Sequence, residues 1–251
     1  MRPIATVTLT VLAASLAFGQ ATPKPPLKPK SKGEATAVNA MLTAPDPDAR
    51  IKAADDLITK YADTGYKSYA LYLEADSYLQ KNDSDKAIVY AEQAVDADAQ
   101  NYQALVLLTK TYAQTTHVND LDKAEKLAKI DKYGKAALTA IEGATKPNPQ
   151  LGDAEWEGVK KDFAGQAYLG LGIAAVLSNK IPDAMADFDK TATMDTDATD
   201  LIRAGRSLLE AKKYPEAVMQ FDKAIAFPNV ADQIKKIAEN DKARAQGMIK
   251  K

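Results

Sequence analysis

The chain has 251 residues, of which 46% are hydrophobic and 27% are charged, and this is the composition of a folded protein rather than of a disordered one. It contains no cysteine, which excludes disulfides, thiolate zinc sites and a cysteine nucleophile. Its single histidine, His117, leaves almost no material for a histidine-rich metal site or a Ser-His triad. Five of the 33 basic residues precede residue 33. Residues 33–251 therefore carry 28 basic and 34 acidic side chains. This acidic balance argues against a nucleic-acid-binding body.

The first 21 residues have the pattern of a secretory signal peptide. Arg2 is followed by about fifteen mostly apolar residues and then by small residues. The apolar stretch is shorter than the roughly twenty residues that a membrane helix needs. We therefore expect residues 1–21 to be removed after Gly19 or Ala21, and the mature protein to lie in the periplasm or cell envelope. An uncleaved amphipathic anchor is the alternative.

Residues 22–33 form a linker rich in proline and lysine. Proline fixes the backbone and the lysines repel one another, so we expect an extended spacer without a core. Two interpretations stay open. The segment is a plain leash, or it makes a weak contact with anionic envelope material through Lys24, Lys28, Lys30 and Lys32.

A repeat of 33 to 34 residues organises the rest of the chain. The stretch Lys180–Lys190 matches Lys213–Lys223 at a shift of 33 residues, with proline, alanine and Phe-Asp-Lys at the same places. Proline suits the first turn of a helix, where its missing N–H leaves no bond unmade, so both stretches are predicted helix starts. An apolar segment precedes each one across a short polar turn. Each period is therefore predicted to be a helical hairpin.

The positions that repeat resemble those of the tetratricopeptide repeat (TPR). In that family the first helix carries a large residue, Leu, a small residue and Tyr at offsets 0, 3, 4 and 7, and the second helix carries a small residue, an aromatic and a small residue. The matching sets of first-helix residues are Leu71, Glu74, Ala75, Tyr78; Leu105, Leu108, Thr109, Tyr112; Tyr168, Leu171, Gly172, Ala175; and Leu201, Ala204, Gly205, Leu208. The matching second-helix sets are Ala217, Phe221, Ala224; Ala184, Phe188, Thr191; and Ala87, Ala91, Ala94.

This resemblance covers residues 34–251 and implies an all-α fold. It implies an α-solenoid of antiparallel helical hairpins wound into a right-handed superhelix, as in secreted TPR proteins of bacterial envelopes. Glu74 departs from the family pattern because it takes the place of a leucine. The expected units are 34–67, 68–101, 102–146, 153–197 and 198–230, and a polar terminal helix at 231–251 caps the array.

Few residues are candidates for catalysis. Trp156 lies among Asp153, Glu155 and Glu157, and a carboxylate pair beside an aromatic ring is typical of sugar-active sites. Glu155 and Glu157 fall on different faces of a helix, however, so we interpret these acids as the first turn of a helix. His117 is expected to be exposed in a polar turn between helices.

Two further motifs are better explained by packing and turns. Gly170 and Gly172 follow no strand, so they are interpreted as points of close helix contact and not as a dinucleotide loop. The run Asp195–Asp200 lacks the glycine and the terminal glutamate of a calcium loop and is interpreted as a turn. The sequence thus predicts no catalytic residue, no cofactor and no metal site.

Binding is the activity that the architecture offers. The resemblance implies a concave wall built from the first helices, on which peptides or partner helices lie. The stripe one residue beyond the core stripe is predicted to face this groove. It comprises Tyr72, Asp76, Val106, Lys110, Leu169, Ile173, Val176, Ile202 and Arg206, with Leu79, Ala113 and Leu209 beside them. Leu169, Ile173 and Val176 have a second interpretation, as core residues covered by the long helix inserted within residues 115–164.

The sequence therefore predicts a non-catalytic protein-interaction scaffold of the periplasm or envelope that binds a peptide or partner helix in the groove. One alternative is an envelope-tethered structural adaptor that acts through the basic linker. Another is a small-molecule or glycan-binding protein, or an enzyme, built around Trp156. Whether the insertion at 115–164 fills the groove or extends it stays open.

Overall fold

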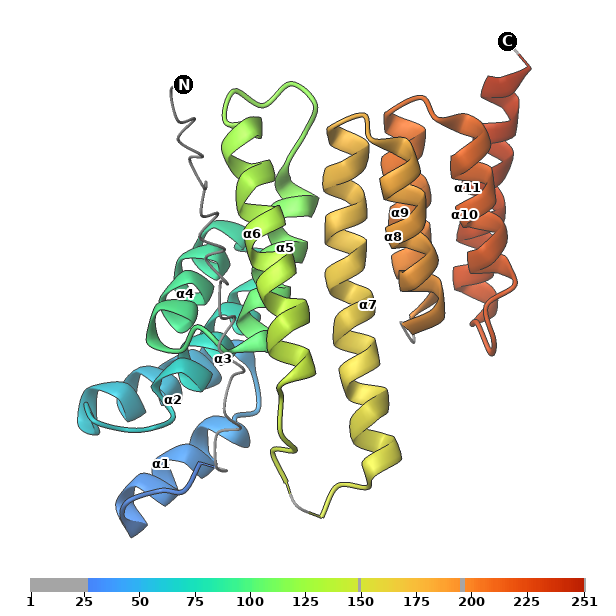
Figure 1. The fold of residues 1–251 in the computed structure, drawn as a ribbon. Coiled ribbons are helices and arrows are strands. Elements are labelled where there is room, and N and C mark those ends of the chain that lie inside the picture. The colour runs from blue at the N-terminus through green and yellow to red at the C-terminus, as the bar shows by residue number, and fades with distance from the viewer. Residues whose placement is uncertain (1–26, 149, 195–196, 251) are drawn as a thin grey trace, which may run out of the picture.

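The computed structural model describes residues 27–148, 150–194 and 197–250, and these residues form eleven α-helices (Figure 1). The predicted signal peptide at 1–21 and Lys24 of the linker lie outside the described residues. No helix in the described part of the chain is long and apolar enough to cross a membrane. The helices are α1 (Lys32–Leu42), α2 (Pro47–Lys60), α3 (Lys67–Gln80), α4 (Ser84–Ala97), α5 (Tyr102–Thr115), α6 (Lys123–Glu142), α7 (Asp153–Leu177), α8 (Ile181–Met194), α9 (Ala198–Glu210), α10 (Tyr214–Ile225) and α11 (Asp232–Ile249).

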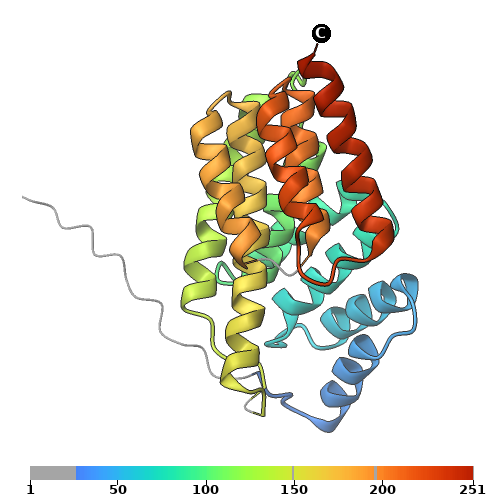
Figure 2. The ribbon, with the colours of Figure 1, turned by 90° about the vertical axis from the view of Figure 1, so that its right-hand side faces the viewer.

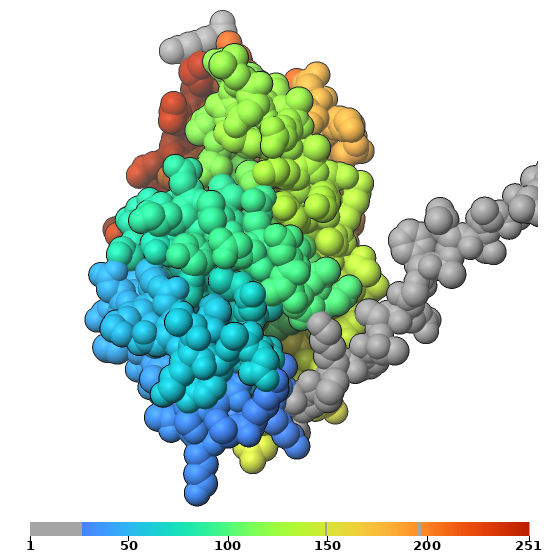
Figure 3. Space-filling model, turned by 90° about the vertical axis from the view of Figure 1, so that its left-hand side faces the viewer, coloured from blue at the N-terminus to red at the C-terminus, as the bar shows by residue number. Residues whose placement is uncertain are grey.

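Successive helices pair into antiparallel hairpins that stack along the molecule. The pairs are α1 with α2, α3 with α4, α5 with α6, α7 with α8, and α9 with α10, and α11 packs against α10 and α9. Figure 1 shows this succession from α1 at the lower left to α11 at the right, and Figure 3 shows the first hairpins stacked in space-filling form. The fold is a TPR-like α-solenoid, with one hairpin in each of the five expected units.

The first helices of the hairpins form the inner wall. Contacts join α3 to α5, α5 to α7, α7 to α9, and α9 to α11. Among the second helices of the described units, only α8 and α10 make a comparable contact. The first helices therefore lie closer together than the second helices, and the stack curves with the first helices on the concave side.

Local sequence explains where many helices begin. Five of them start after a side chain that accepts a hydrogen bond from a free backbone N–H of the first turn. Proline follows in the first turn of α2 and α10. The capping residues are Ser31 for α1, Asp46 for α2, Asp83 for α4, Asn101 for α5 and Asp197 for α9.

Three of the hairpin turns share one backbone geometry. Asn82, Asn179 and Lys212 all have positive φ, at 59°, 55° and 60°. In each case the next residue donates its N–H to the carbonyl five positions earlier, at 2.8 to 2.9 Å. This is the Schellman arrangement, which ends a helix and satisfies its last carbonyls. Asparagine tolerates the left-handed region better than lysine does, because its short side chain bonds locally.

Two glycines bring the helices of a hairpin together at equivalent places. A Cβ on Gly172 would lie 2.5 Å from the ring of Phe188, and a Cβ on Gly205 would lie 2.5 Å from the ring of Phe221. Both phenylalanines have no exposed surface. Gly170 likewise meets the side chain and carbonyl of Thr109. The prediction that Gly170 and Gly172 permit close helix contact is confirmed.

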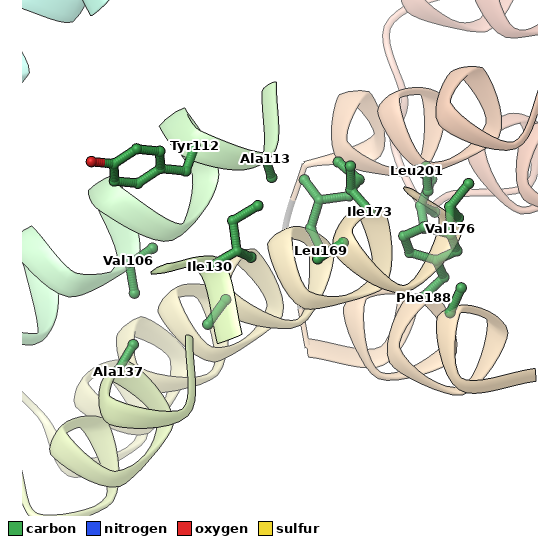
Figure 4. Packing of buried hydrophobic residues seen from close by; sticks show 14 of the residues in the cluster. Val106, Tyr112, Ala113, Ile130, Ala137, Leu169, Ile173, Val176, Phe188 and Leu201 are labelled. Carbon is green, nitrogen blue, oxygen red and sulfur yellow. The ribbon is translucent and has the colours of Figure 1, made fainter. Parts of the chain in front are cut away.

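The buried apolar residues form one large cluster, a smaller one at the N-terminal end, and a third of Leu71, Ala94 and Ala104 that shares partly buried neighbours with both. The large cluster runs from Ala75 on α3 to Ala245 on α11, and Figure 4 shows side chains from α5 to α9 meeting around α7. The smaller cluster belongs to α1, α2 and the start of α3. Its buried members are Val38, Met41, Ala54, Leu57 and Ala70.

The second half of the predicted linker is packed against the body. Lys30 Nζ lies 2.8 Å from the carboxylate of Asp63, and the Tyr66 hydroxyl donates to the Leu27 carbonyl at 3.0 Å. The helix α1 then begins at Lys32. Lys30 thus pairs with Asp63 in the α2–α3 turn, but its side chain is 58% exposed, so its contact with anionic envelope material stays a prediction. Lys28 and Lys32 are exposed.

Candidate functional site

A hollow of about 490 Å³ opens on the inner wall, between the C-terminal halves of α5, α7 and α9. Its apolar lining includes Ala113 of α5 and Ile173, Val176 and Leu177 of α7. Figure 4 shows Ala113 beside Ile173, where the two helices meet. Figure 2 shows α9 and α11 on one side of the molecule, in orange and red. The hollow thus lies where three successive hairpins present their first helices together.

The rim of the hollow is charged, with a positive excess. Arg203, Arg206 and Lys212 line it with a single carboxylate, Glu210. Arg206 Nε donates to Asp241 of α11 at 2.7 Å. A second hollow, of about 250 Å³, lies next to it between α9 and α11, and it adds Arg244 to the same surface.

The turn between α5 and α6 forms one side of the hollow. Asp120 accepts hydrogen bonds from the His117 backbone N–H at 3.0 Å and from Lys126 Nζ at 3.1 Å. These bonds hold the pKa of Asp120 below its usual value. The braced turn presents Val118, 55% exposed, and Leu121, fully exposed. Because Thr116, His117 and Val118 line the hollow, this part of the insertion extends the groove and does not fill it.

Three of the predicted groove residues line the hollow, and three others are core. Ile173, Val176 and Arg206 are lining residues, although Ile173 and Val176 are only 7% and 4% exposed and also belong to the large apolar cluster, as their second interpretation predicts. Val106, Leu169 and Ile202 are instead 2%, 1% and 3% exposed and belong to the large apolar cluster, so the expectation that they face an open groove is corrected. The reason is that α5, α7 and α9 pack directly against one another, which covers these three side chains.

Lys110 ties the three inner helices together. Its Nζ donates to Gln166 of α7 at 2.9 Å and lies 3.8 Å from the carboxylate of Asp200 on α9. Asp200 is 2% exposed and also binds Arg203. A buried carboxylate needs such partners, because an unpaired charge there would be strongly destabilising. Lys110 is a structural tie beside the hollow and not part of its lining.

Tyr72 and Asp76 lie on α3, away from the hollow. The ring of Tyr72 is 6.0 Å from that of Tyr69, and burial raises the pKa of the Tyr72 hydroxyl. Asp76 lies 3.5 Å from Arg50 of α2 and accepts from Gln80 at 2.7 Å. Neither Tyr72 nor Asp76 lines the hollow.

The surroundings of Trp156 do not form a pocket of converging carboxylates. Trp156 is 5% exposed, and its ring meets Tyr102 edge-on at 6.3 Å. Glu157 pairs with Lys160 at 2.6 Å, and Asp153 pairs with Lys146, both at the surface. Within the described residues, no group of three or more His, Cys, Asp or Glu side chains is placed to hold a metal ion.

One polar cluster has no counterpart in the sequence analysis. Glu92 Oε1 of α4 accepts from the hydroxyls of Tyr112 at 2.9 Å and Tyr133 at 3.1 Å, and from Lys129 Nζ at 3.2 Å. Burial opposes ionisation, but these hydrogen bonds and the charge of Lys129 outweigh it and lower the pKa of Glu92. The members come from α4, α5 and α6, so no spacing along one helix could have revealed the cluster.

No family model matches the sequence, and no curated protein matches it. Among solved structures, the chain is similar to a thermophilic TPR protein of Thermus thermophilus. The two share 14% sequence identity over 83% of this chain and 98% of that chain, with a TM-score of 0.49. The description of the fold therefore stands on the hairpins, turns and glycines of this chain.

Proposed function

We propose that this TPR-like solenoid is a non-catalytic protein-interaction scaffold that holds a peptide or a partner helix on its inner wall. The hollow between α5, α7 and α9 is the observation that supports the proposal. It combines an apolar floor with a charged, open rim, which is the combination that anchors a peptide side chain and orients its neighbours. Its volume is at the lower end of the range of ligand sites.

The chemistry of the lining favours binding over catalysis. His117 is the one histidine of the chain and lines the hollow, and its side chain is 70% exposed. A general base works best when neighbours fix its position and tune its pKa in a site that excludes water. The exposed imidazole at the mouth of an open hollow suits contact with a partner better.

We further propose that the scaffold acts in the periplasm or cell envelope. The pattern of residues 1–21 supports export. Cell fractionation with N-terminal sequencing of the mature protein tests this location. A mature chain that starts at residue 20 or 22 in the envelope fraction is the expected result, and an intact Met1 in the cytoplasm contradicts it.

Affinity capture from envelope extract tests the binding role. Ser207 lines the hollow, so Ser207→Trp should fill it and abolish capture of the partner. Thr139→Trp is a matched control, because Thr139 is an exposed α6 residue whose hydroxyl, like that of Ser207, bonds to a carbonyl of its own helix. Equal capture by both variants contradicts a role for the hollow. If deletion of residues 22–26 abolishes capture and Ser207→Trp does not, the adaptor that acts through its linker is the better account.

A further inference from the structure

We propose that the hollow selects an acidic peptide, in which a bulky apolar side chain enters the floor and neighbouring carboxylates meet the cationic rim. This inference rests on the proposed function and adds the chemical class of the partner. It assigns a role to three features: the cations that line the hollow, the orientation of Arg206, and the exposed apolar residues of the α5–α6 turn.

The lining of the hollow carries more cations than carboxylates, whereas residues 33–251 as a whole are acidic. Residues 33–251 carry 28 basic and 34 acidic side chains, yet the hollow is lined by three cations and one carboxylate. The cations Arg203, Arg206 and Lys212 lie along the C-terminal half of α9 and its turn, and the adjoining hollow adds Arg244 and Asp241 of α11. Arg203 pairs with Asp200 and Arg206 with Asp241, and the cations still outnumber the carboxylates. A local excess of this kind attracts acidic partners and repels basic ones.

Arg206 is held in a position to bind a carboxylate. Asp241 accepts from its Nε at 2.7 Å, and no other hydrogen bond or ion pair of Arg206 occurs among the described residues. The side chain of Arg206 is 53% exposed. The terminal nitrogens of the guanidinium can therefore take a carboxylate oxygen from a partner, and planar Arg–carboxylate pairing is among the stronger charged hydrogen bonds.

The apolar part of the site has a floor and a wall. Ile173 and Val176 contribute to the floor, and Val118 in the braced turn stands opposite as part of the lining. Leu121 of the same turn is fully exposed. A partner with a leucine or phenylalanine in the hollow would also cover these two exposed residues.

A peptide is a better occupant than a nucleic acid or a phosphate-rich surface. The floor is apolar and would leave sugar and phosphate groups without partners, whereas it removes an aliphatic or aromatic side chain from water. A basic peptide would place its charges against Arg203, Arg206 and Lys212, and that repulsion disfavours it.

Selection from a random library of 12-residue peptides tests the inference. The expected result is enrichment of peptides that carry Asp or Glu within four residues of Leu, Ile, Phe or Met, and their binding should weaken at least tenfold between low and high salt. Enrichment of apolar peptides without acidic residues overturns the inference and leaves the proposed function standing. A library that yields no peptide sensitive to Ser207→Trp contradicts both.

Charge variants make the test specific to the rim. Arg206→Gln with Lys212→Asn should weaken binding of a selected peptide at least tenfold, and asparagine accommodates the positive φ of residue 212. Lys235→Gln with Lys236→Gln removes the same charge from exposed positions on α11 and should leave binding unchanged. Equal loss in both double variants points to overall charge and contradicts a specific rim.

Turn variants test the apolar wall separately. Val118→Ser with Leu121→Ser should also weaken binding at least tenfold, without loss of helicity, because both side chains are exposed. Val89→Ser with Met219→Ser serves as the control, because these two apolar side chains on the second helices are 50% and 51% exposed. Unchanged binding in the Val118 and Leu121 variant removes the turn from the site.

Discussion

Glu74 is a buried carboxylate without a partner. It lies on α3 with no exposed surface, and neither of its oxygens has a hydrogen bond among the described residues. The groups that interact with its charge are Asp55 of α2 and Tyr90 of α4, and neither is a cation. Burial, with a smaller effect of the charge on Asp55, raises the pKa of Glu74 to about 8. The side chain therefore stays protonated at neutral pH.

This burial predicts a protein that loses stability as the pH rises. The unfolded chain releases the Glu74 proton near pH 4.5 and the folded chain near pH 8, so the folded state binds more protons in between. The free energy of unfolding should fall by at most about 1.4 kcal/mol per pH unit across this window. Guanidinium unfolding of wild type and Glu74→Leu at several pH values measures the slope.

The leucine variant sharpens this prediction, since leucine is what the TPR pattern has at this position. Glu74→Leu should be more stable than wild type at pH 8, and its slope between pH 5 and pH 8 should be flatter. Asp56→Leu, at an exposed position on α2, is a control for added apolar surface. A variant with the wild-type slope would show that other groups set the pH dependence.

Glu92 has the opposite environment and predicts the opposite dependence. The pKa of Glu92 is lowered in the folded state. Its ionised form therefore stabilises the fold above the usual pKa of a glutamate, and this stabilisation is lost as the pH falls through the lowered pKa. Glu92→Ala should lower the free energy of unfolding at pH 7 by about 2 kcal/mol, because it leaves the Tyr112 and Tyr133 hydroxyls and Lys129 without their shared acceptor. Thermal unfolding beside Gln93→Ala, the exposed neighbour, provides the comparison. Equal losses in both variants contradict a special role for the cluster.

At the scale of the elements, the turn after α9 carries a residue poorly suited to its backbone. Lys212 has φ of 60°, where the equivalent turns have Asn82 and Asn179. A side chain in the left-handed region costs roughly 1 kcal/mol, which glycine avoids. Lys212→Gly should therefore raise the free energy of unfolding by about 0.5–1 kcal/mol in denaturant unfolding. Lys213→Gly, one residue on at negative φ, should bring no gain.

The elements themselves could largely be predicted from the sequence, whereas the site could not. Pro182 and Pro215 mark helix starts because proline fits a first helical turn, and each lies in the first turn of its helix. Periodicity gives the buried face of one helix, but it does not give the distance between neighbouring helices. That distance depends on pairs such as Gly170 and Thr109, far apart in the sequence. For this reason the repeat pattern leaves Leu169 open between groove and core, and the structure shows that it is core.

The residues that line the hollow could also be predicted from the sequence only in part. Arg206 could be placed from its position in the repeat, but Val118 and Lys212 belong to turns, to which the repeat pattern assigns no face. Their place at the hollow follows from the braced turn around Asp120 and from the way in which α9 ends. The signal in the sequence was indirect: an insertion after α5 that carries two apolar residues between polar ones.

For the whole molecule, the division of the core predicts uneven stability. The helix α1 packs on α2, and these two share a small cluster with the start of α3, while the large cluster runs from α3 to α11. Only the three buried residues Leu71, Ala94 and Ala104 form a cluster between the two. In a stack of repeats, each unit is stabilised by its neighbours, so a terminal unit with one neighbour and a small core opens most easily. Glu74 lies next to this boundary, between α2 and α4.

We therefore expect amide hydrogens of α1 and α2 to exchange faster than those of α5, α7 and α9 in native-state hydrogen exchange. Leu57→Ala, in the small cluster, should speed exchange in α1 and α2 and leave the inner helices protected, since the large cluster stays intact. Leu108→Ala, equally buried in the large cluster, should instead lower the global free energy of unfolding by about 2–5 kcal/mol. The same exchange in all helices after Leu57→Ala would mean that the stack unfolds as a single unit. The helices that line the hollow would then open whenever α1 and α2 open, so the stability of the site would depend on the N-terminal hairpin.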